Sequence, residues 1–267
     1  MHPVLRSLVA ALVAALISHT WATSTVAQAP ANLVSVPVSS LRFASDRIAD
    51  PSGDELQTFG GDGSIIEQAR VEVMSILTEE NSCSAWFRSA EPEAAEKFRS
   101  LRFALDESAN GEIRRIDKWQ ESPTYYQPYV AHTGQNVGWG STITINAKGA
   151  FFKDWARVRV IVNNADPGYV KAFRQLGVGN FGGATREARI LTLLHELGHV
   201  LDLLPIDSGV PLGPQLSTQN TGLVLQHCGA QIRHFAKHPP NLATATFLME
   251  SPLSARVTAI DSHAPKR

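Results

Sequence analysis

Two histidines and a glutamate stand at a spacing that suits a metal ion. The segment His195-Glu196-Leu197-Gly198-His199 places two imidazoles four residues apart. In a helix, residues four apart lie on one face, so both rings can reach a single zinc ion at about 2.0–2.1 Å. Glu196 lies about 100° away around the helix axis, where its carboxylate can accept a proton from zinc-activated water. The pentapeptide therefore predicts a catalytic zinc site.

The residues before this motif favour a buried helix. Residues 188–194 are apolar nearly all round, as in a core helix. Thr185 is the predicted N-cap, and Glu187 lies in the first turn, where the helix dipole favours an anion. The competing interpretation is a core helix whose histidines are satisfied by hydrogen bonds alone.

With its context, the motif resembles the zincin metallopeptidases. The resemblance covers residues 184–207 and depends on the segment Thr192-Leu193-Leu194 followed by the pentapeptide. It implies that His195 and His199 are zinc ligands and that Glu196 is the general base. It also implies an edge strand that pairs with an extended substrate, and residues 141–146 are the candidate for this strand. The alternative is that residues 141–146 form an ordinary sheet strand.

A catalytic zinc ion normally has three protein ligands, so a third is expected. The extended metzincin pattern needs Gly at position 202 and His at position 205, but this chain has Asp202 and Pro205, which excludes a strict metzincin. Snapalysin-like peptidases have a variant that ends in Asp after a Gly-Leu-Pro turn. Residues 203–207 resemble that turn lengthened by two residues, so Asp207 is the first candidate for the third ligand.

His227 is the second candidate, on a helix predicted at residues 218–232. Gluzincins have their third ligand on such a later helix, although it is a Glu. Asp202 lies almost a turn beyond His199, too far along a straight helix to coordinate easily. We expect Asp202 to orient a ligand histidine or to occupy the helix terminus. Otherwise, Asp207 would be a plain turn residue and His227 a surface histidine.

The beginning of the chain is typical of a secretory signal. Arg6 precedes an apolar run at residues 8–17, and Ala27-Gln28-Ala29 matches a small-x-small cleavage site. The apolar run is about half the length that a membrane-spanning helix needs. No cysteine lies near the cleavage site, which excludes lipid attachment there. The sequence therefore predicts a secreted or periplasmic protein without a stable membrane anchor.

The two cysteines, Cys83 and Cys228, both lie in the expected mature chain. Because exported proteins meet an oxidising compartment, we expect them to form a disulfide. The alternative is a pair of buried free thiols. Residues 1–29 hold one of the 24 Lys and Arg residues and none of the 25 Asp and Glu residues, which leaves a net charge of −2. This near balance gives no bias toward nucleic acid or anionic membranes.

The remaining pattern predicts an α+β fold. A helix is expected from residue 64 to about residue 81, beginning with a capping box of Ser64 and Glu67, and a second from Pro92 to before Asn110. Strands are expected at residues 141–146 and 158–162. With the resemblance, this implies a zincin-like fold with a small mixed sheet, a backing helix, a buried zinc helix and a helical C-terminal part.

The predicted organisation has four parts. A signal peptide at residues 1–29 is followed by a poorly patterned segment at residues 30–63, in which only residues 33–38 resemble a strand. The metallopeptidase domain extends over residues 64–236, and residues 237–267 are a loosely attached tail.

The predicted function is a secreted zinc metallopeptidase that acts on peptides or proteins and not on nucleic acid. Two alternatives remain at this point. The chain could be a non-enzymatic exported binding protein on a zincin-like scaffold, or a metal-dependent amidase acting on cell-wall peptide. The candidates for stabilising the oxyanion, besides the metal, are Tyr169 and the histidines that have no other role assigned.

Overall fold

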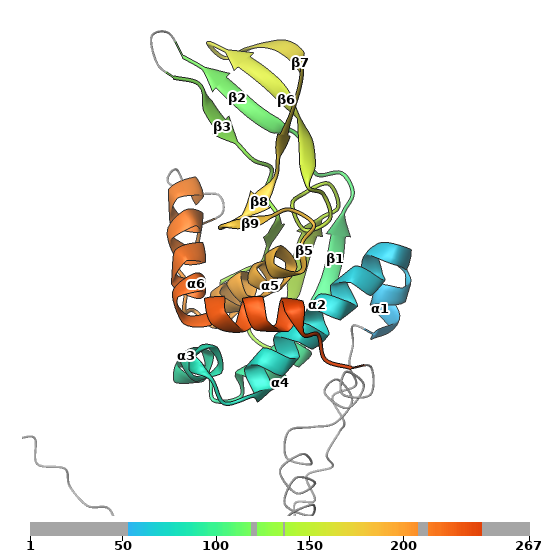
Figure 1. The fold of residues 1–267 in the computed structure, drawn as a ribbon, viewed down its shortest axis with the longest axis vertical. Helices are drawn as coiled ribbons and strands as arrows, with labels where there is room; N and C mark the ends of the chain where they lie inside the picture. Colours follow the sequence, from blue (N-terminus) through green and yellow to red (C-terminus); the bar gives the residue numbers. More distant parts are fainter. Residues whose placement is uncertain (1–52, 119–121, 136, 208–212, 242–267) are drawn as a thin grey trace, which may run out of the picture. The chain divides into compact units, whose positions relative to one another are not determined.

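The computed structural model describes residues 53–118, 122–135, 137–207 and 213–241 (Figure 1). The predicted signal peptide, the strand-like residues 33–38 and residues 242–267 of the predicted tail lie outside this range. The described helices are α1 (Gly53–Gln57), α2 (Gly60–Thr78), α3 (Ser82–Ala90), α4 (Ala94–Arg99), α5 (Arg186–Val200) and α6 (Gly213–Lys237). None of them has both the length and the hydropathy needed to cross a membrane.

The described strands form small sheets of mixed direction, so the molecule is α+β. The strands are β1 (Arg102–Asp106), β2 (Ile113–Asp117), β3 (Thr124–Tyr126), β4 (Ala131–His132), β5 (Thr142–Asn146), β6 (Trp155–Val162), β7 (Ala165–Gln175), β8 (Gly177–Val178) and β9 (Phe181–Gly182). The sheet orders are β1-β5-β4, β3-β2-β6-β7 and β8-β9. In the first sheet, β5 is parallel to β1 and antiparallel to β4.

The strand prediction at residues 141–146 is confirmed, but its expected place at a sheet edge is wrong. Strand β5 lies between β1 and β4, with Ile143 and Ile145 fully buried. The edge on the side of α5 is the short strand β4. Sequence alternation shows that a strand has a buried face, but it does not show which neighbours pair with its two edges.

The buried helix α5 is confirmed with its predicted cap. The Thr185 hydroxyl accepts a hydrogen bond from the Ala188 backbone N–H, and α5 begins at the next residue, Arg186. Residues 190–200 are all buried. At its N-terminal end, Arg186 forms an ion pair with the buried Glu72 of α2. These contacts fix α5 in the core.

The predicted start of the first helix is wrong. Helix α2 begins at Gly60, so Ser64 lies inside the helix and cannot cap it. A Cβ atom at Gly63 would lie 1.9 Å from the Leu56 carbonyl oxygen, which means that α1 and α2 pack at a distance that only glycine permits. Helices thus occupy residues 53–57 and 60–63, where the sequence pattern indicated no element.

The helix predicted from Pro92 to Asn110 is also wrong in its second half. Only residues 94–99 are helical, as α4, and residues 102–106 form β1. Phe103 pairs with Ile143 of β5, and both side chains are buried. A strand partner 40 residues away in the chain therefore overrides the local helical spacing.

The predicted disulfide is confirmed: Cys83 of α3 is bonded to Cys228 of α6 across 145 residues of chain. Helix α6 is longer than the predicted residues 218–232 at both ends. It packs against α5, α3 and α2, so the disulfide lies within the helical core.

Candidate metal centre

Helix α5 presents two imidazoles to the same point. His195 and His199 are 8% and 4% exposed, and their Nε2 atoms are 3.1 Å apart. This convergence follows from their four-residue spacing, which places both rings on one face of the helix.

The chain reverses direction at the end of α5 through a Schellman turn. The Leu203 N–H bonds to the Gly198 carbonyl at 2.9 Å, and the Asp202 N–H bonds to the His199 carbonyl at 3.1 Å. Asp202 has φ +58°, in the left-handed region where glycine is most common. It therefore makes the turn without the glycine that the metzincin pattern has at this position. The turn sends the following residues back toward the histidines.

The returning segment brings Asp207 to the two imidazoles. One carboxylate oxygen lies 3.1 Å from His195 Nε2, and the other lies 3.3 Å from His199 Nε2. Burial raises the pKa of Asp207, but hydrogen bonds and charge attraction from the two histidines outweigh it and hold this pKa well below its usual range. Burial lowers the pKa of His199, but Asp207, Glu196 and the Leu204 carbonyl together raise it above its usual value.

The three side chains form a group that could hold a metal ion. Four atoms arranged tetrahedrally about 2.05 Å from a zinc ion would be about 3.3 Å from one another. The two Nε2 atoms are 3.1 Å apart, and each lies 3.1–3.3 Å from a different oxygen of Asp207, which brings all three groups within reach of one ion. This donor set of two imidazoles and a carboxylate also leaves a fourth position for water or substrate.

The other ring nitrogen of each histidine has an oxygen partner. His195 Nδ1 lies 3.2 Å from the Thr221 hydroxyl, and His199 Nδ1 lies 3.4 Å from the Leu204 carbonyl oxygen. A carbonyl can only accept, so His199 donates to it from Nδ1, and Nε2 is the nitrogen that would face a metal ion. The same tautomer at His195 would make Thr221 an acceptor. This arrangement suits histidines that bind a metal through Nε2.

Helix α6 orients the carboxylate as well. The Asn220 side-chain amide donates to an Asp207 oxygen at 3.1 Å and to the Pro205 carbonyl at 2.9 Å. Asn220 is 1% exposed, so these bonds are shielded from water. Asn220 and Thr221 therefore hold two of the three possible ligands from one turn of α6.

Glu196 lies beside the group, in a buried position. Burial raises its pKa to about 7, although the charges of His195 and His199 and a hydrogen bond from the Thr133 backbone lower it. Its Oε2 atom is buried and has no hydrogen-bond partner among the described residues. Thr133 directly follows β4, so the edge strand ends beside this carboxylate.

His227 does not join the group. Its ring stacks on Trp86 of α3, with 4.7 Å between centroids and 7° between planes. Its backbone carbonyl accepts a hydrogen bond from Ser82. His227 is next to Cys228, whose disulfide fixes this part of α6 against α3. The part of α6 that faces the two histidines lies almost two turns earlier, at Asn220 and Thr221.

Asp202 makes no contact with either histidine ring. Its side chain accepts a hydrogen bond from Gln135, which also donates to the Leu204 carbonyl at 3.5 Å. Since His199 Nδ1 faces that same carbonyl, Asp202 acts on the site through Gln135 and through its helix-terminal backbone. Tyr169, considered for the oxyanion, lies on β7, and its hydroxyl contacts Glu112.

Sequence reasoning missed Asn220 and Thr221. A signal was present, because Thr221 continues the buried face formed by Val224, Cys228 and Ile232 at helical spacing. A polar residue on an otherwise apolar face indicates a buried hydrogen-bond partner. The roles of Thr133 and Gln135 have no such signal, since they come from loops that reach α5 only in the folded chain.

No protein-family model, curated protein or solved structure matches this chain. The function must therefore be inferred from the residues of the site.

Proposed function

We propose that this chain is an exported zinc-dependent peptidase. The observation that carries the proposal is the meeting of His195, His199 and Asp207, whose nitrogen and oxygen atoms lie 3.1–3.3 Å apart, with Glu196 beside them. The three side chains would hold the ion. When bound, zinc supplies Lewis-acid chemistry, which polarises a carbonyl and lowers the pKa of water toward about 7.

Glu196 is the proposed proton carrier. Its carboxylate can take a proton from the attacking water and return it to the leaving amine. Its partnerless Oε2 atom provides an acceptor that no described side chain already satisfies. Because water attacks directly, the reaction requires no covalent bond between enzyme and substrate.

Strand β4 is the proposed guide for an extended substrate. It is an antiparallel edge strand, and it runs directly into Thr133, whose backbone hydrogen-bonds to Glu196. A peptide paired along this edge would pass close to the general base. Export is supported by the signal-like start of the chain and by the disulfide, which forms in oxidising compartments.

The test compares Glu196→Gln with Glu187→Gln, a change of the same type in the first turn of the same helix. The purified chain should bind about one zinc ion and cleave members of a peptide library, measured by elemental analysis and mass spectrometry. Glu196→Gln should keep the zinc and lose about 10²–10⁴-fold in hydrolysis rate, whereas Glu187→Gln should keep both.

Hydrolysis that survives Glu196→Gln would refute the mechanism. Bound zinc without turnover of any peptide would favour the non-enzymatic binding protein. Cleavage confined to cell-wall peptides would favour the amidase.

A further inference from the structure

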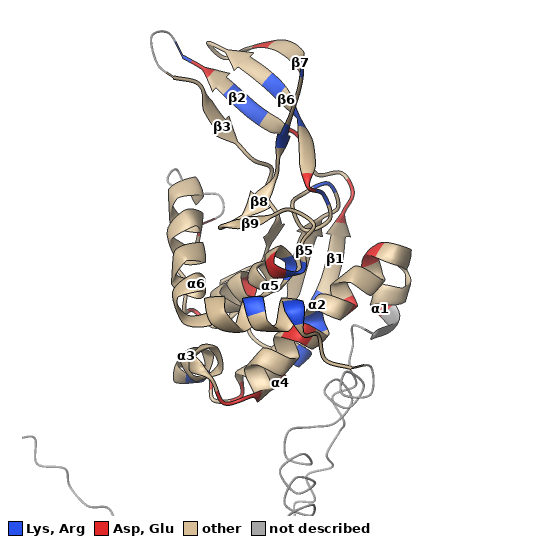
Figure 2. Ribbon diagram, in the orientation of Figure 1, with Lys and Arg blue, Asp and Glu red and all other residues tan. Residues whose placement is uncertain are grey.

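The four-stranded sheet β3-β2-β6-β7 has a composition unlike that of the rest of the chain. Its strands contain six basic residues and two acidic ones, although the whole chain has a net charge of −1. Figure 2 shows basic positions on β2, β6 and β7. The same strands contain five exposed aromatic residues: Tyr125, Tyr126, Trp155, Tyr169 and Phe173. Arg, Tyr and Trp are the side chains most enriched at protein interfaces.

One row of side chains crosses all four strands. Tyr126 of β3 is opposite Arg114 of β2, Arg114 is beside Arg159 of β6, and Arg159 is opposite Tyr169 of β7. Residues directly opposite one another share a face of the sheet. We call these four residues the tyrosine–arginine row. Arg157 extends the row, because its guanidinium lies 5.1 Å from the centre of the Tyr169 ring.

Arg157 and Arg159 lie against the Tyr169 ring, and Arg159 also has acidic partners. Arg159 lies 5.0 Å from the centre of the Tyr169 ring and is paired with Asp166 and Glu112. Arg114 and Arg157 are exposed, and no ion pair is found for them within the described residues. A guanidinium held against a ring, as that of Arg157 is, presents planar donors to a carboxylate at a reduced entropic cost.

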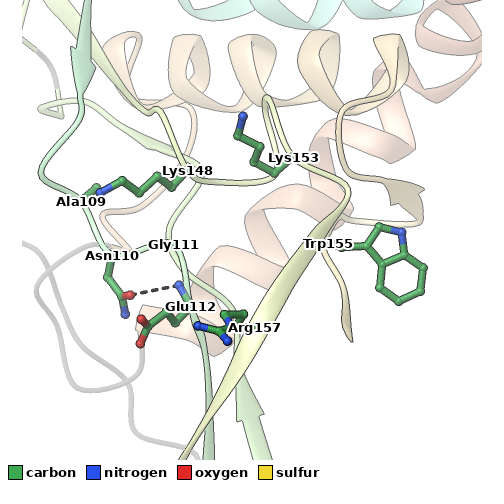
Figure 3. A pocket seen from close by; sticks show the side chains of 8 residues that line it. All are labelled: Ala109, Asn110, Gly111, Glu112, Lys148, Lys153, Trp155 and Arg157. Carbon is green, nitrogen blue, oxygen red and sulfur yellow. Dashed lines mark hydrogen bonds between the residues drawn. The ribbon is translucent and has the colours of Figure 1, made fainter. Parts of the chain in front are cut away.

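Two hollows adjoin the row and share Asn110. The larger, about 380 Å³, is lined by Arg114, Tyr126 and Tyr129 with apolar neighbours. The smaller, about 320 Å³, is lined by basic Lys148, Lys153 and Arg157 and by Glu112. Figure 3 shows Glu112 beside Arg157, whereas Trp155 projects away from them. Each hollow thus combines at least one cationic side chain with space for a side chain of a partner.

We propose that this face binds an acidic segment of a polypeptide and recruits it as substrate. The inference that the bound segment belongs to a substrate rests on the proposed peptidase function. The exposed Arg114 and Arg157 complement acidic side chains, and the tyrosine–arginine row and hollows offer bidentate donors and ring surfaces to a peptide. Strand β7 leads through β8 and β9 into α5, so this sheet directly precedes the candidate metal centre along the chain.

A polypeptide fits this face better than a nucleic acid does. Arg157 and Arg159 flank the Tyr169 ring, so this ring is engaged and not free to stack on bases. Glu112 and Asp166 would also repel a continuous phosphate backbone. Carboxylates spaced along a peptide can avoid these two acidic groups.

The test measures binding separately from hydrolysis. The full chain with Glu196→Gln is titrated against a fluorescent peptide of alternating Glu and Ser, followed by fluorescence anisotropy. Arg114→Ser/Arg157→Ser should weaken binding about tenfold, and added salt should abolish it. The matched control, Arg233→Ser/Lys237→Ser, removes the same charge from exposed positions of α6 and should leave affinity unchanged.

Equal affinity of both double variants would overturn the proposal, as would tighter binding of a single-stranded oligonucleotide or masking of the face by self-association. In the protein with Glu196 intact, the face variant should raise KM for an acidic-tagged substrate and leave cleavage of a short neutral peptide unchanged. Binding of the acidic peptide without hydrolysis in any assay would refute the proposed peptidase function but not the proposed binding surface. Hydrolysis without binding of the acidic peptide would refute the surface alone.

Discussion

The Asp207 carboxylate organises the candidate metal centre, because each of its oxygens faces a different imidazole. Without a cation, this arrangement depends on protons shared among the three groups. If a divalent ion were bound, a lone pair of each of the three groups would bind the ion. The neighbours that fix Asp207 and His195 should therefore matter for metal affinity.

Removing the hydrogen bonds from α6 should weaken metal binding. Asn220→Ala leaves Asp207 free to rotate, and Thr221→Val removes the oxygen beside His195 Nδ1. Each change should reduce zinc affinity about 10–100-fold, measured by competition with a chelator. Gln226→Ala, at an exposed position of the same helix, is the control and should have no effect. Unchanged affinity in both site variants would exclude an orienting role.

The buried Glu196 should make the metal-free protein less stable as pH rises. Its pKa is about 7 in the folded chain against an ordinary value of 4.5, so the folded state retains this proton longer than the unfolded state does. The contribution of Glu196 to the free energy of unfolding is therefore fully present below about pH 4.5 and is lost as pH rises through about 7. Between pH 4 and pH 8, the free energy of unfolding of Glu196→Gln should rise by about 3 kcal/mol relative to that of the parent. Denaturant titrations of both metal-free proteins would reveal this divergence, and parallel pH profiles would contradict it.

At the scale of elements, the end of α5 determines whether the third candidate ligand reaches the histidines. The Schellman turn at Asp202 reverses the chain, and Leu204 then packs over Gly198. A Cβ atom at Gly198 would lie 2.5 Å from Leu204 Cδ1. The absence of a side chain at this motif position thus permits the close return of the chain.

Gly198→Ala should displace Leu204 and the segment that carries Asp207. We expect a loss of about 1–3 kcal/mol in unfolding free energy together with weaker zinc binding. Gly222→Ala in α6 is the matched control, because a Cβ atom there meets nothing within 4 Å. Without a clash, alanine should stabilise that helix by about 0.5–1 kcal/mol. Thermal unfolding of both variants tests the pair, and equal shifts would show that the packing on Gly198 is not restrictive.

Local signals predicted some elements and misplaced others. Helix α5 was predictable because its cap and its apolar residues lie within the helix itself. Strand β1 was not, because its conformation depends on pairing with β5 about 40 residues later. The start of α2 depends on close packing against α1 at Gly63, a contact that sequence periodicity does not encode.

At the scale of the molecule, the disulfide joins two distant parts of the helical core. It connects α3 to α6, the helix that carries Asn220 and Thr221. Closing a loop of this length restricts the unfolded chain and, in the chain-entropy model, contributes about 4–5 kcal/mol.

Removing the disulfide should therefore destabilise the whole fold. Cys83→Ala/Cys228→Ala should lose about 4–5 kcal/mol in unfolding free energy, measured by urea denaturation. A reducing agent should destabilise the parent to a similar extent and leave the double variant unchanged. Sensitivity of the double variant to the reductant would show that the effect has another origin.

The sequence by itself was enough to predict the buried helix that carries the two histidines and the glutamate between them. It was also enough to predict the pairing of the two cysteines. These features follow from four-residue helical spacing, a local cap and the presence of only two cysteines in the chain. The choice of Asp207 over His227, the orienting contacts of α6 and the edge position of β4 were decided only by the tertiary structure. The reason is that they depend on a chain reversal and on packing between segments that are distant in sequence.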